Sequence, residues 1–245
     1  MADGYHCRPH LGGGVMTGML ASVNSLPEAL LALAAQIDII DLKQPSQGAL
    51  GALAVADVRP IVAAIAGRCP VSATIGDLPL LPDNVGAAVQ AMAETGVDFV
   101  KIGFFPRGDA EGTVRHLKAL GLAQKHRLIA VLFADSQPDW GIIPLLKQHG
   151  FSGVMLDTMD KSKGSLTAVM TPPEISQFVR LAKQASLLCG LAGSLRLDDI
   201  ARLAPLQADY LGFRGALCVQ QQRTAQLDEV RLRQIRDALN KLRRD

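Results

Sequence analysis

The chain has 245 residues, of which 49% are hydrophobic and 20% are charged, a composition that can bury a large core in one barrel or in two smaller domains. Its 25 basic and 23 acidic residues give a formal net charge of +2, which offers no electrostatic basis for binding nucleic acid. The four cysteines lie far apart without a CxxC pair. This spacing argues against a disulfide framework or a zinc knuckle and predicts free thiols in a reducing compartment.

The N-terminal segment has neither the features of a signal peptide nor those of a membrane anchor. The first fifteen residues contain no hydrophobic stretch of the kind that a secretory signal requires, and no apolar run in the chain approaches the roughly 20 residues of a membrane span. We therefore expect a cytoplasmic protein without a membrane partner. The periodic pattern begins only at Met19, so we interpret residues 1–18 as a flexible N-terminal leader and residues 19–245 as the catalytic domain.

Along the chain, short segments rich in β-branched and apolar residues alternate with segments that have apolar positions at helical spacing. The predicted strands cover residues 19–23, 37–43, 70–76, 98–104, 127–135, 153–158, 187–194 and 210–215. The predicted helices cover residues 26–36, 58–68, 83–96, 109–126, 140–149, 172–185, 198–206 and 229–242. The first helix has a clear start signal, with Ser25 as its N-cap, Pro27 in its first turn and Glu28 three residues after the cap.

Eight strand and helix pairs in a chain of this length predict an α/β protein with a single (β/α)8 barrel, the TIM-barrel fold, because strands joined by helices form right-handed parallel crossovers. The alternative is a doubly wound open sheet. That fold is disfavoured because no G-x-G-x-x-G sequence follows the first strand and no linker divides the chain.

The second predicted strand ends in two charged residues. On a strand, alternate side chains share a face, so the four odd-numbered residues point the same way: Ile37, Ile39, Asp41 and Lys43. A carboxylate and an ammonium group therefore end a segment that is otherwise suited to burial. Pro45 and the glycines after it indicate a loop that allows close approach to a ligand.

Further charged residues come from other strands. Lys101 lies in the fourth strand, Asp157 ends the sixth, and Lys161 and Lys163 follow in the next loop. In a barrel these residues converge at the carboxyl ends of the strands, where barrel enzymes have their active sites. Burial and neighbouring cations lower the pKa of a lysine and supply the neutral amine that forms an imine with a carbonyl. The pattern predicts Schiff-base chemistry, which requires no metal or organic cofactor.

The last two strands end in small residues. Gly193 and Ser194 end the seventh strand, and Gly215 with the adjacent Ala216 ends the eighth. Barrel folds often bind phosphate at this place through backbone amides, and the neighbouring Arg214 can add a bidentate contact. The two predictions together favour a small phosphorylated carbonyl compound as substrate.

Several short motifs combine these residues in a fixed order. They are Asp41-Leu-Lys43-x-Pro45-x-x-Gly48-x-Leu50-Gly51-Ala52, Val71-Ser-Ala-Thr-x-Gly76-Asp77, Asp98-x-Val-Lys101-x-Gly103, Met155-Leu-Asp157-Thr158 with Lys161, Leu191-Ala-Gly-Ser194-Leu, and Arg214-Gly-Ala-x-Cys218. In this order they closely resemble the (5-formylfuran-3-yl)methyl phosphate synthase family. The resemblance extends over residues 19–242.

This resemblance implies a (β/α)8 barrel that condenses two glyceraldehyde 3-phosphate molecules, with loss of phosphate and water, into the furan precursor of methanofuran-type C1 carriers. By position it implies that Lys43 is the Schiff-base lysine, that Lys101 is the proton acceptor, and that Asp41, Asp157 and Lys161 support them. Lys163 is a second amine in the same loop, so the choice between Lys161 and Lys163 stays open.

Two other functions remain as alternatives. One is a decarboxylase or aldolase of the phosphate-binding barrels, some of which carry an Asp-x-Lys pair on a strand; here Gln44-Pro-Ser-Gln47 replaces the usual acidic partner that follows such a pair. The other is a sugar-phosphate sensor that binds without turnover. We also expect a homo-oligomer, since barrels often self-associate.

Overall fold

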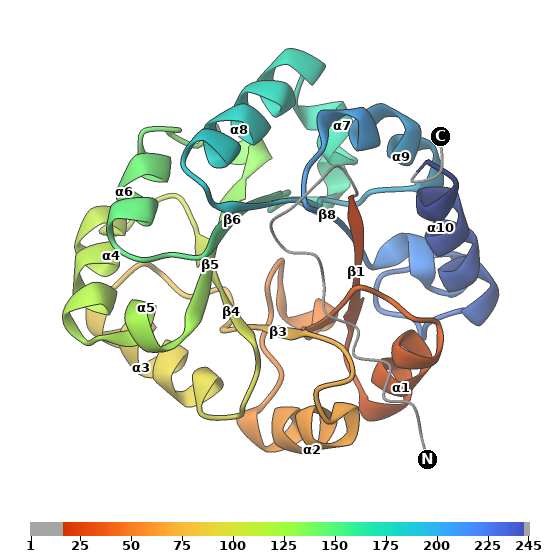
Figure 1. Ribbon diagram of the computed structural model, residues 1–245, viewed down its shortest axis with the longest axis horizontal. Helices are drawn as coiled ribbons and strands as arrows, with labels where there is room; N and C mark the ends of the chain where they lie inside the picture. Colours follow the sequence, from red (N-terminus) through yellow and green to blue (C-terminus); the bar gives the residue numbers. More distant parts are fainter. Residues whose placement is uncertain (1–16, 243–245) are drawn as a thin grey trace.

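The computed structural model describes residues 17–242. Eight parallel strands form a closed barrel in sequence order, and helices surround it (Figure 1). The strands are β1 (Gly18–Val23), β2 (Ile39–Leu42), β3 (Val71–Thr74), β4 (Phe99–Phe104), β5 (Arg127–Phe133), β6 (Gly153–Asp157), β7 (Leu188–Leu191) and β8 (Tyr210–Phe213). β1 pairs with β8 as well as with β2, which closes the sheet. The predicted (β/α)8 barrel is confirmed.

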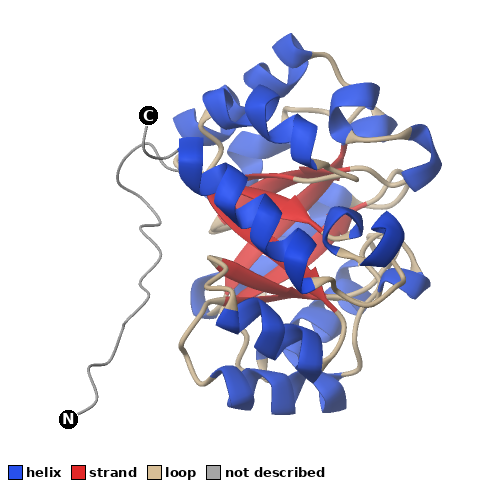
Figure 2. Cartoon of the chain, turned by 90° about the vertical axis from the view of Figure 1, so that its right-hand side faces the viewer, coloured by secondary structure: helices blue, strands red, loops and turns tan. Residues whose placement is uncertain are grey.

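The helices lie outside the strands, which cross the molecule at a slant (Figure 2). They are α1 (Leu26–Ala34), α2 (Val55–Ile65), α3 (Pro82–Ala93), α4 (Ala110–Ala119), α5 (Leu122–Lys125), α6 (Ile142–Gln148), α7 (Leu166–Val169), α8 (Pro172–Gln184), α9 (Leu197–Leu203) and α10 (Glu229–Leu242). The single helix predicted over residues 109–126 is wrong. It divides into α4 and α5 because Gly121 adopts a left-handed conformation with φ of 71°. The short α7 was not predicted.

Two layers of apolar side chains flank the strands. Ile39, Phe99 and Tyr210 belong to the cluster inside the barrel, while Ile40 and Leu42 pack in the larger layer between strands and helices. The alternation predicted for the second strand is therefore confirmed from Ile39 onward. The placement of Ile37 on the inner face is wrong, because this residue precedes β2 and packs in the outer layer.

The first described residues already belong to the barrel. Gly18 begins β1 and lies opposite Tyr210, and the Thr17 hydroxyl donates to the carbonyl oxygen of Ala208 at 2.8 Å. Residues 17 and 18, which fall in the predicted leader, thus contact the barrel, and the rest of the predicted leader lies outside the described residues. No helix in the described part of the chain is long and apolar enough to cross a membrane.

Candidate active site

The carboxylate of Asp41 is fully buried inside the barrel and is held by three strands. The Ser22 hydroxyl from β1 donates to Oδ2 at 2.8 Å, and the Ser72 hydroxyl from β3 donates to Oδ1 at 2.6 Å. Lys101 Nζ from β4 lies 3.1 Å from the same Oδ1. Burial alone would raise the pKa of Asp41, but the Lys101 ammonium and the two hydroxyls more than offset this effect and lower it. Asp41 therefore stays ionised and fixes the Lys101 side chain.

Lys43 follows β2 on the same face, and its side chain is only 7% exposed. Within residues 17–242, Nζ of Lys43 makes neither a hydrogen bond nor an ion pair. Burial lowers the pKa of Lys43 from 10.5 to about 8; the carboxylates of Asp157 and Asp41 oppose this shift, and the cations of Lys161 and Lys101 reinforce it. A substantial fraction of this amine is therefore neutral near physiological pH, as a nucleophile requires.

Asp157 ends β6 and lies opposite Lys43 in the cavity. Its Oδ1 accepts a hydrogen bond from Lys161 Nζ at 2.5 Å and one from the Thr158 amide at 2.7 Å. Burial would raise the pKa of Asp157, but Lys161 and Lys43 hold it at about 2. Lys161 and Lys163 both belong to the 3-10 turn Lys161–Lys163, yet only Lys161 reaches the cavity, while Lys163 is exposed.

The residues predicted to bind phosphate line the same cavity, which has a volume of about 230 Å³. No described residue accepts a hydrogen bond from the backbone amides of Gly193, Ser194, Gly215 or Ala216. Gly193 is required here because its φ is 106° and because a Cβ would lie 2.9 Å from the Thr158 amide nitrogen. Ser194 also has a positive φ, of 48°. Four backbone donors without partners form a site suited to an anion.

The side chain of Arg214 does not take part in this amide site. Its Nε and both terminal nitrogens bond the carbonyl oxygens of Arg223, Ser22 and Ala225, at 2.8, 3.1 and 2.8 Å respectively, and the guanidinium also pairs with the buried Glu28 carboxylate. These contacts use all five N–H donors of the guanidinium. The structure therefore replaces the predicted phosphate contact by a structural ion pair that joins β8 to α1.

Replacing Glu28 by glutamine is expected to lower the free energy of unfolding by about 3–5 kcal/mol, because it leaves the buried Arg214 charge uncompensated. Glu28 also accepts hydrogen bonds from the amides of Asn24 and Leu227, both at 3.0 Å. Urea unfolding measures the change. The matched control is Glu229→Gln, which removes an exposed ion pair with Arg233 and should cost less than about 1 kcal/mol. Equal effects of the two changes would contradict the structural role of Glu28.

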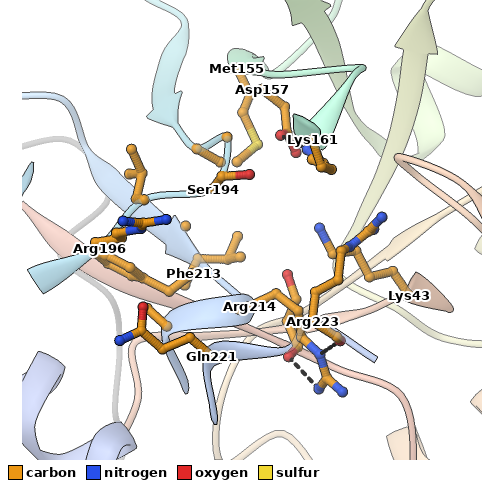
Figure 3. A pocket seen from close by; sticks show the side chains of 18 of the residues that line it. Lys43, Met155, Asp157, Lys161, Ser194, Arg196, Phe213, Arg214, Gln221 and Arg223 are labelled. Atoms are coloured by element: carbon orange, nitrogen blue, oxygen red, sulfur yellow. Dashed lines mark hydrogen bonds and ion pairs between the residues drawn. The ribbon is translucent and has the colours of Figure 1, made fainter. Parts of the chain in front are cut away.

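Sequence reasoning missed other residues of the site. Ser22 and Ser72, the hydroxyl donors to Asp41, could have been found, since each occupies an inward position of a predicted strand. Arg196 and Arg223 line the cavity and add positive charge; neither lies in a periodic segment that would have indicated its orientation. Figure 3 shows Arg223 and Lys43 on one side of the cavity and Ser194 and Arg196 on the other.

Among residues 17–242, no three His, Cys, Asp or Glu side chains are grouped so that they could hold a metal ion. The cations that line the cavity are Lys43, Lys101, Lys161, Arg196, Arg223 and the Glu28-paired Arg214, and the one carboxylate among the lining residues is that of Asp157. This excess of positive charge favours phosphate esters. A buried lysine with a lowered pKa and backbone amides without partners in one barrel mouth are typical of one class, the barrel enzymes that act on phosphorylated carbonyl compounds through a lysine.

Comparison with known sequences narrows this class. The sequence pattern of the 4-HFC-P synthases matches residues 19–236. A protein of Methylorubrum extorquens, provisionally named (5-formylfuran-3-yl)methyl phosphate synthase, is 42% identical over 90% of this chain and 91% of its own length. The (5-formylfuran-3-yl)methyl phosphate synthase of Methanosarcina acetivorans is 31% identical over 84% of this chain and 93% of its own. The chain belongs to the (5-formylfuran-3-yl)methyl phosphate synthase family of enzymes.

Comparison with solved structures supports the fold alone. Phosphoribosyl anthranilate isomerase from Thermus thermophilus superimposes with a TM-score of 0.65 over 91% of this chain and 99% of its own, at 14% identity. A 3-hexulose-6-phosphate synthase gives a TM-score of 0.63 over 91% of this chain and 99% of its own, at 16% identity. Both comparisons place the chain among (β/α)8 barrels.

Proposed function

We propose that this enzyme condenses two molecules of glyceraldehyde 3-phosphate into (5-formylfuran-3-yl)methyl phosphate, with release of phosphate and water, for the synthesis of a methanofuran-type C1 carrier. The observation that carries the proposal is the position of Lys43. Its buried amine has no hydrogen-bond partner among the described residues, and it lines the same cavity as four unpartnered backbone amides. This arrangement supports imine formation with a carbonyl compound whose phosphate is held by the amides.

The first step is the attack of the neutral Lys43 amine on the aldehyde carbon of one glyceraldehyde 3-phosphate. Water leaves, and the resulting iminium group withdraws electrons from the adjacent carbon. Lys101, in its neutral form, then removes a proton from that carbon, which leaves an enamine. The Asp41 carboxylate, 3.1 Å from Lys101 Nζ, orients this lysine and compensates its charge when it is protonated.

The enamine expels the phosphate from the next carbon, which gives an enol, and the terminal carbon of this enol forms the new C–C bond by attacking the ketone carbon of the second triose phosphate, isomerised to its ketone form. Ring closure of a hydroxyl of the second triose onto the carbonyl carbon of the first, two dehydrations and hydrolysis of the imine follow, which give the aromatic furan aldehyde and free Lys43. Lys161, held by Asp157 at 2.5 Å, is placed to donate a proton to departing oxygen atoms. The atoms of two triose phosphates balance those of the furan product, one phosphate and two waters, so the conversion is redox-neutral.

The rate of imine formation is expected to depend on pH through Lys43. Its pKa of about 8 implies that the neutral fraction rises about tenfold per pH unit below pH 8 and levels off above it. Trapping with borohydride at fixed substrate, measured from pH 6 to 10, gives the profile. In Asp157→Asn the midpoint should move to lower pH, because the Asp157 carboxylate raises the pKa of Lys43. A midpoint that moves to higher pH would contradict this assignment.

The proposed activity is tested by incubating the enzyme with glyceraldehyde 3-phosphate alone. Phosphate release and the absorbance of the furan aldehyde are followed, and a borohydride-quenched sample is mapped by peptide mass spectrometry. Furan formation with an adduct on Lys43 supports the proposal. An adduct without furan would favour an aldolase, and neither adduct nor furan would favour a sugar-phosphate sensor.

Two further expectations stay predictions. Cys189 and Cys218 are buried free thiols, and this supports the proposed cytoplasmic location. Cys69 is also buried, while Cys7 lies outside the described residues. The protein is also expected to form a homo-oligomer, and light scattering of the purified protein measures its mass in solution.

A further inference from the structure

The proposed reaction, on which this inference rests, requires the cavity to hold two phosphate groups at once. The unpartnered amides of Gly193, Ser194, Gly215 and Ala216 form one site. Arg196 lies two residues after Ser194 in the chain, and its side chain is exposed. The second phosphate therefore needs a donor group elsewhere in the cavity.

Arg223 has the properties of such a donor. It lies in the segment between β8 and α10, is half-buried, and lines the cavity on the side of Lys43 (Figure 3). Burial lowers the pKa of Arg223, while the nearby carboxylates of Asp157 and Asp77 oppose that shift, so the guanidinium remains a cation. Among the described residues, neither carboxylate forms a hydrogen bond or an ion pair with the Arg223 side chain, whose hydrogen bond goes to the Gly48 carbonyl instead.

The guanidinium of Arg223 is fixed at one point. Its Nη2 donates to the carbonyl oxygen of Gly48 at 2.9 Å. The loop that carries Gly48 is itself held by Asp77, which accepts hydrogen bonds from the amides of Ala49 and Leu50 at 2.8 and 2.7 Å. Gly48 has φ of 116°, and a Cβ there would lie 2.1 Å from the Asp77 carboxylate. The hydrogen bond between Arg223 and Gly48 therefore depends on a tightly packed loop.

The other donors of Arg223 differ from those of Arg214. Arg214 uses all of its N–H groups on protein acceptors, whereas Arg223 uses one, and the remaining four meet no acceptor among the described residues. A half-buried guanidinium with unused donors is a costly arrangement for a protein that binds nothing there. Its fork geometry matches the oxygens of a phosphate monoester.

We propose that Arg223, whose Cβ lies beside Gly215 of the amide site, extends its guanidinium to the loop after β2 and binds the phosphate of the second triose phosphate there, and that the Gly48 carbonyl and the Asp77-bound loop orient the guanidinium for this contact. The two phosphates then flank the Lys43 amine from two sides. This places the carbonyl of each substrate within the same small cavity, where the C–C bond forms.

Inorganic phosphate is the first probe. In calorimetric titrations the unmodified enzyme should bind two equivalents of phosphate per chain, and Arg223→Gln should bind one. The control is Arg233→Gln, which removes an exposed α10 arginine far from the cavity lining and should leave two equivalents. Unchanged stoichiometry in Arg223→Gln, or the same loss in Arg233→Gln, would overturn the proposal.

Steady-state kinetics provides the second test. Arg223→Gln should raise KM for glyceraldehyde 3-phosphate by at least about tenfold, since a charge-assisted contact is lost. Arg223→Lys should recover part of the loss, because it keeps the charge without the fork. Borohydride trapping of unphosphorylated glyceraldehyde on Lys43 should be unchanged in both variants, which also shows that they fold. A KM within twofold of the unmodified enzyme would refute the role of Arg223.

The two tests separate this inference from the proposed function. If the unmodified enzyme makes no furan but still binds two phosphates, and Arg223→Gln binds one, the second anion site stands and the proposed reaction fails. If furan is formed and Arg223→Gln changes neither stoichiometry nor KM, the reaction stands and Arg223 has no part in binding.

Discussion

Furan formation is expected to fall by at least about 10³-fold in Lys43→Ala, because the covalent route to the enamine is lost. The barrel should remain folded. The Lys43 side chain makes no hydrogen bond or ion pair in the described part of the chain, so its removal leaves no buried partner unsatisfied, and burial already disfavours its charged form. Phosphate release from glyceraldehyde 3-phosphate and the absorbance of the furan aldehyde measure the activity, and thermal unfolding measures the fold.

Lys163→Ala is the matched control for this prediction. Lys163 is a lysine of the same barrel mouth, but its side chain is exposed and does not line the cavity. Turnover and the borohydride-trapped adduct should be unchanged in this variant. An adduct that persists in Lys43→Ala and maps to Lys161 would show that the nucleophile is in the loop after β6 and would refute the assignment to Lys43.

The barrel and much of its site could be predicted because both depend on local periodicity. A strand alternates its side chains between two faces, so Asp41 follows Ile39 into the barrel and Lys101 follows Phe99. Parallel strands also bring their carboxyl ends to one mouth, which places Asp157 near Lys43 although more than one hundred residues separate them. The same reasoning, applied to Ser22 and Ser72, would have predicted the hydroxyls that hold Asp41.

The role of Arg214 could not be predicted in the same way. Its position after β8 was consistent with a phosphate contact, but its direction depends on Glu28, which lies 186 residues earlier in the chain. A pairing at this distance leaves no periodic signal. The two residues meet because β8 closes the barrel against β1, and α1 follows β1. The Arg214 guanidinium pairs with the buried Glu28 carboxylate and does not point into the cavity, because leaving either buried charge unpaired would be costly.

The position of Arg223 could not be predicted from the sequence for a different reason. It lies in a segment with neither strand alternation nor helical spacing, where Gln220 and Gln221 both have positive φ values, of 52° and 58°. Only the three-dimensional structure shows that this segment returns to the barrel mouth and contacts the loop after β2. Loops carry such residues because the barrel supplies a rigid frame on which they can vary.

Replacing Lys101 by methionine is expected to separate imine formation from furan formation. Lys43 remains, so the borohydride-trapped adduct should still form. The proton on the neighbouring carbon loses its acceptor, and furan formation should fall by about 10²–10⁴-fold, the usual contribution of a general base. The ratio of adduct to furan, measured on the same sample by mass spectrometry and absorbance, therefore rises in this variant.

The control for this change must test whether a disturbed Asp41 accounts for the loss. Ser72→Ala removes the hydroxyl that donates to Asp41 Oδ1 at 2.6 Å but keeps the 3.1 Å contact between that oxygen and Lys101. We expect it to retain furan formation within about tenfold, because one neutral hydrogen bond contributes about 1 kcal/mol. If Lys101→Met lowers the adduct and the furan to the same degree, Lys101 acts before the imine forms; if only the furan falls, Lys101 acts on the imine, as proposed.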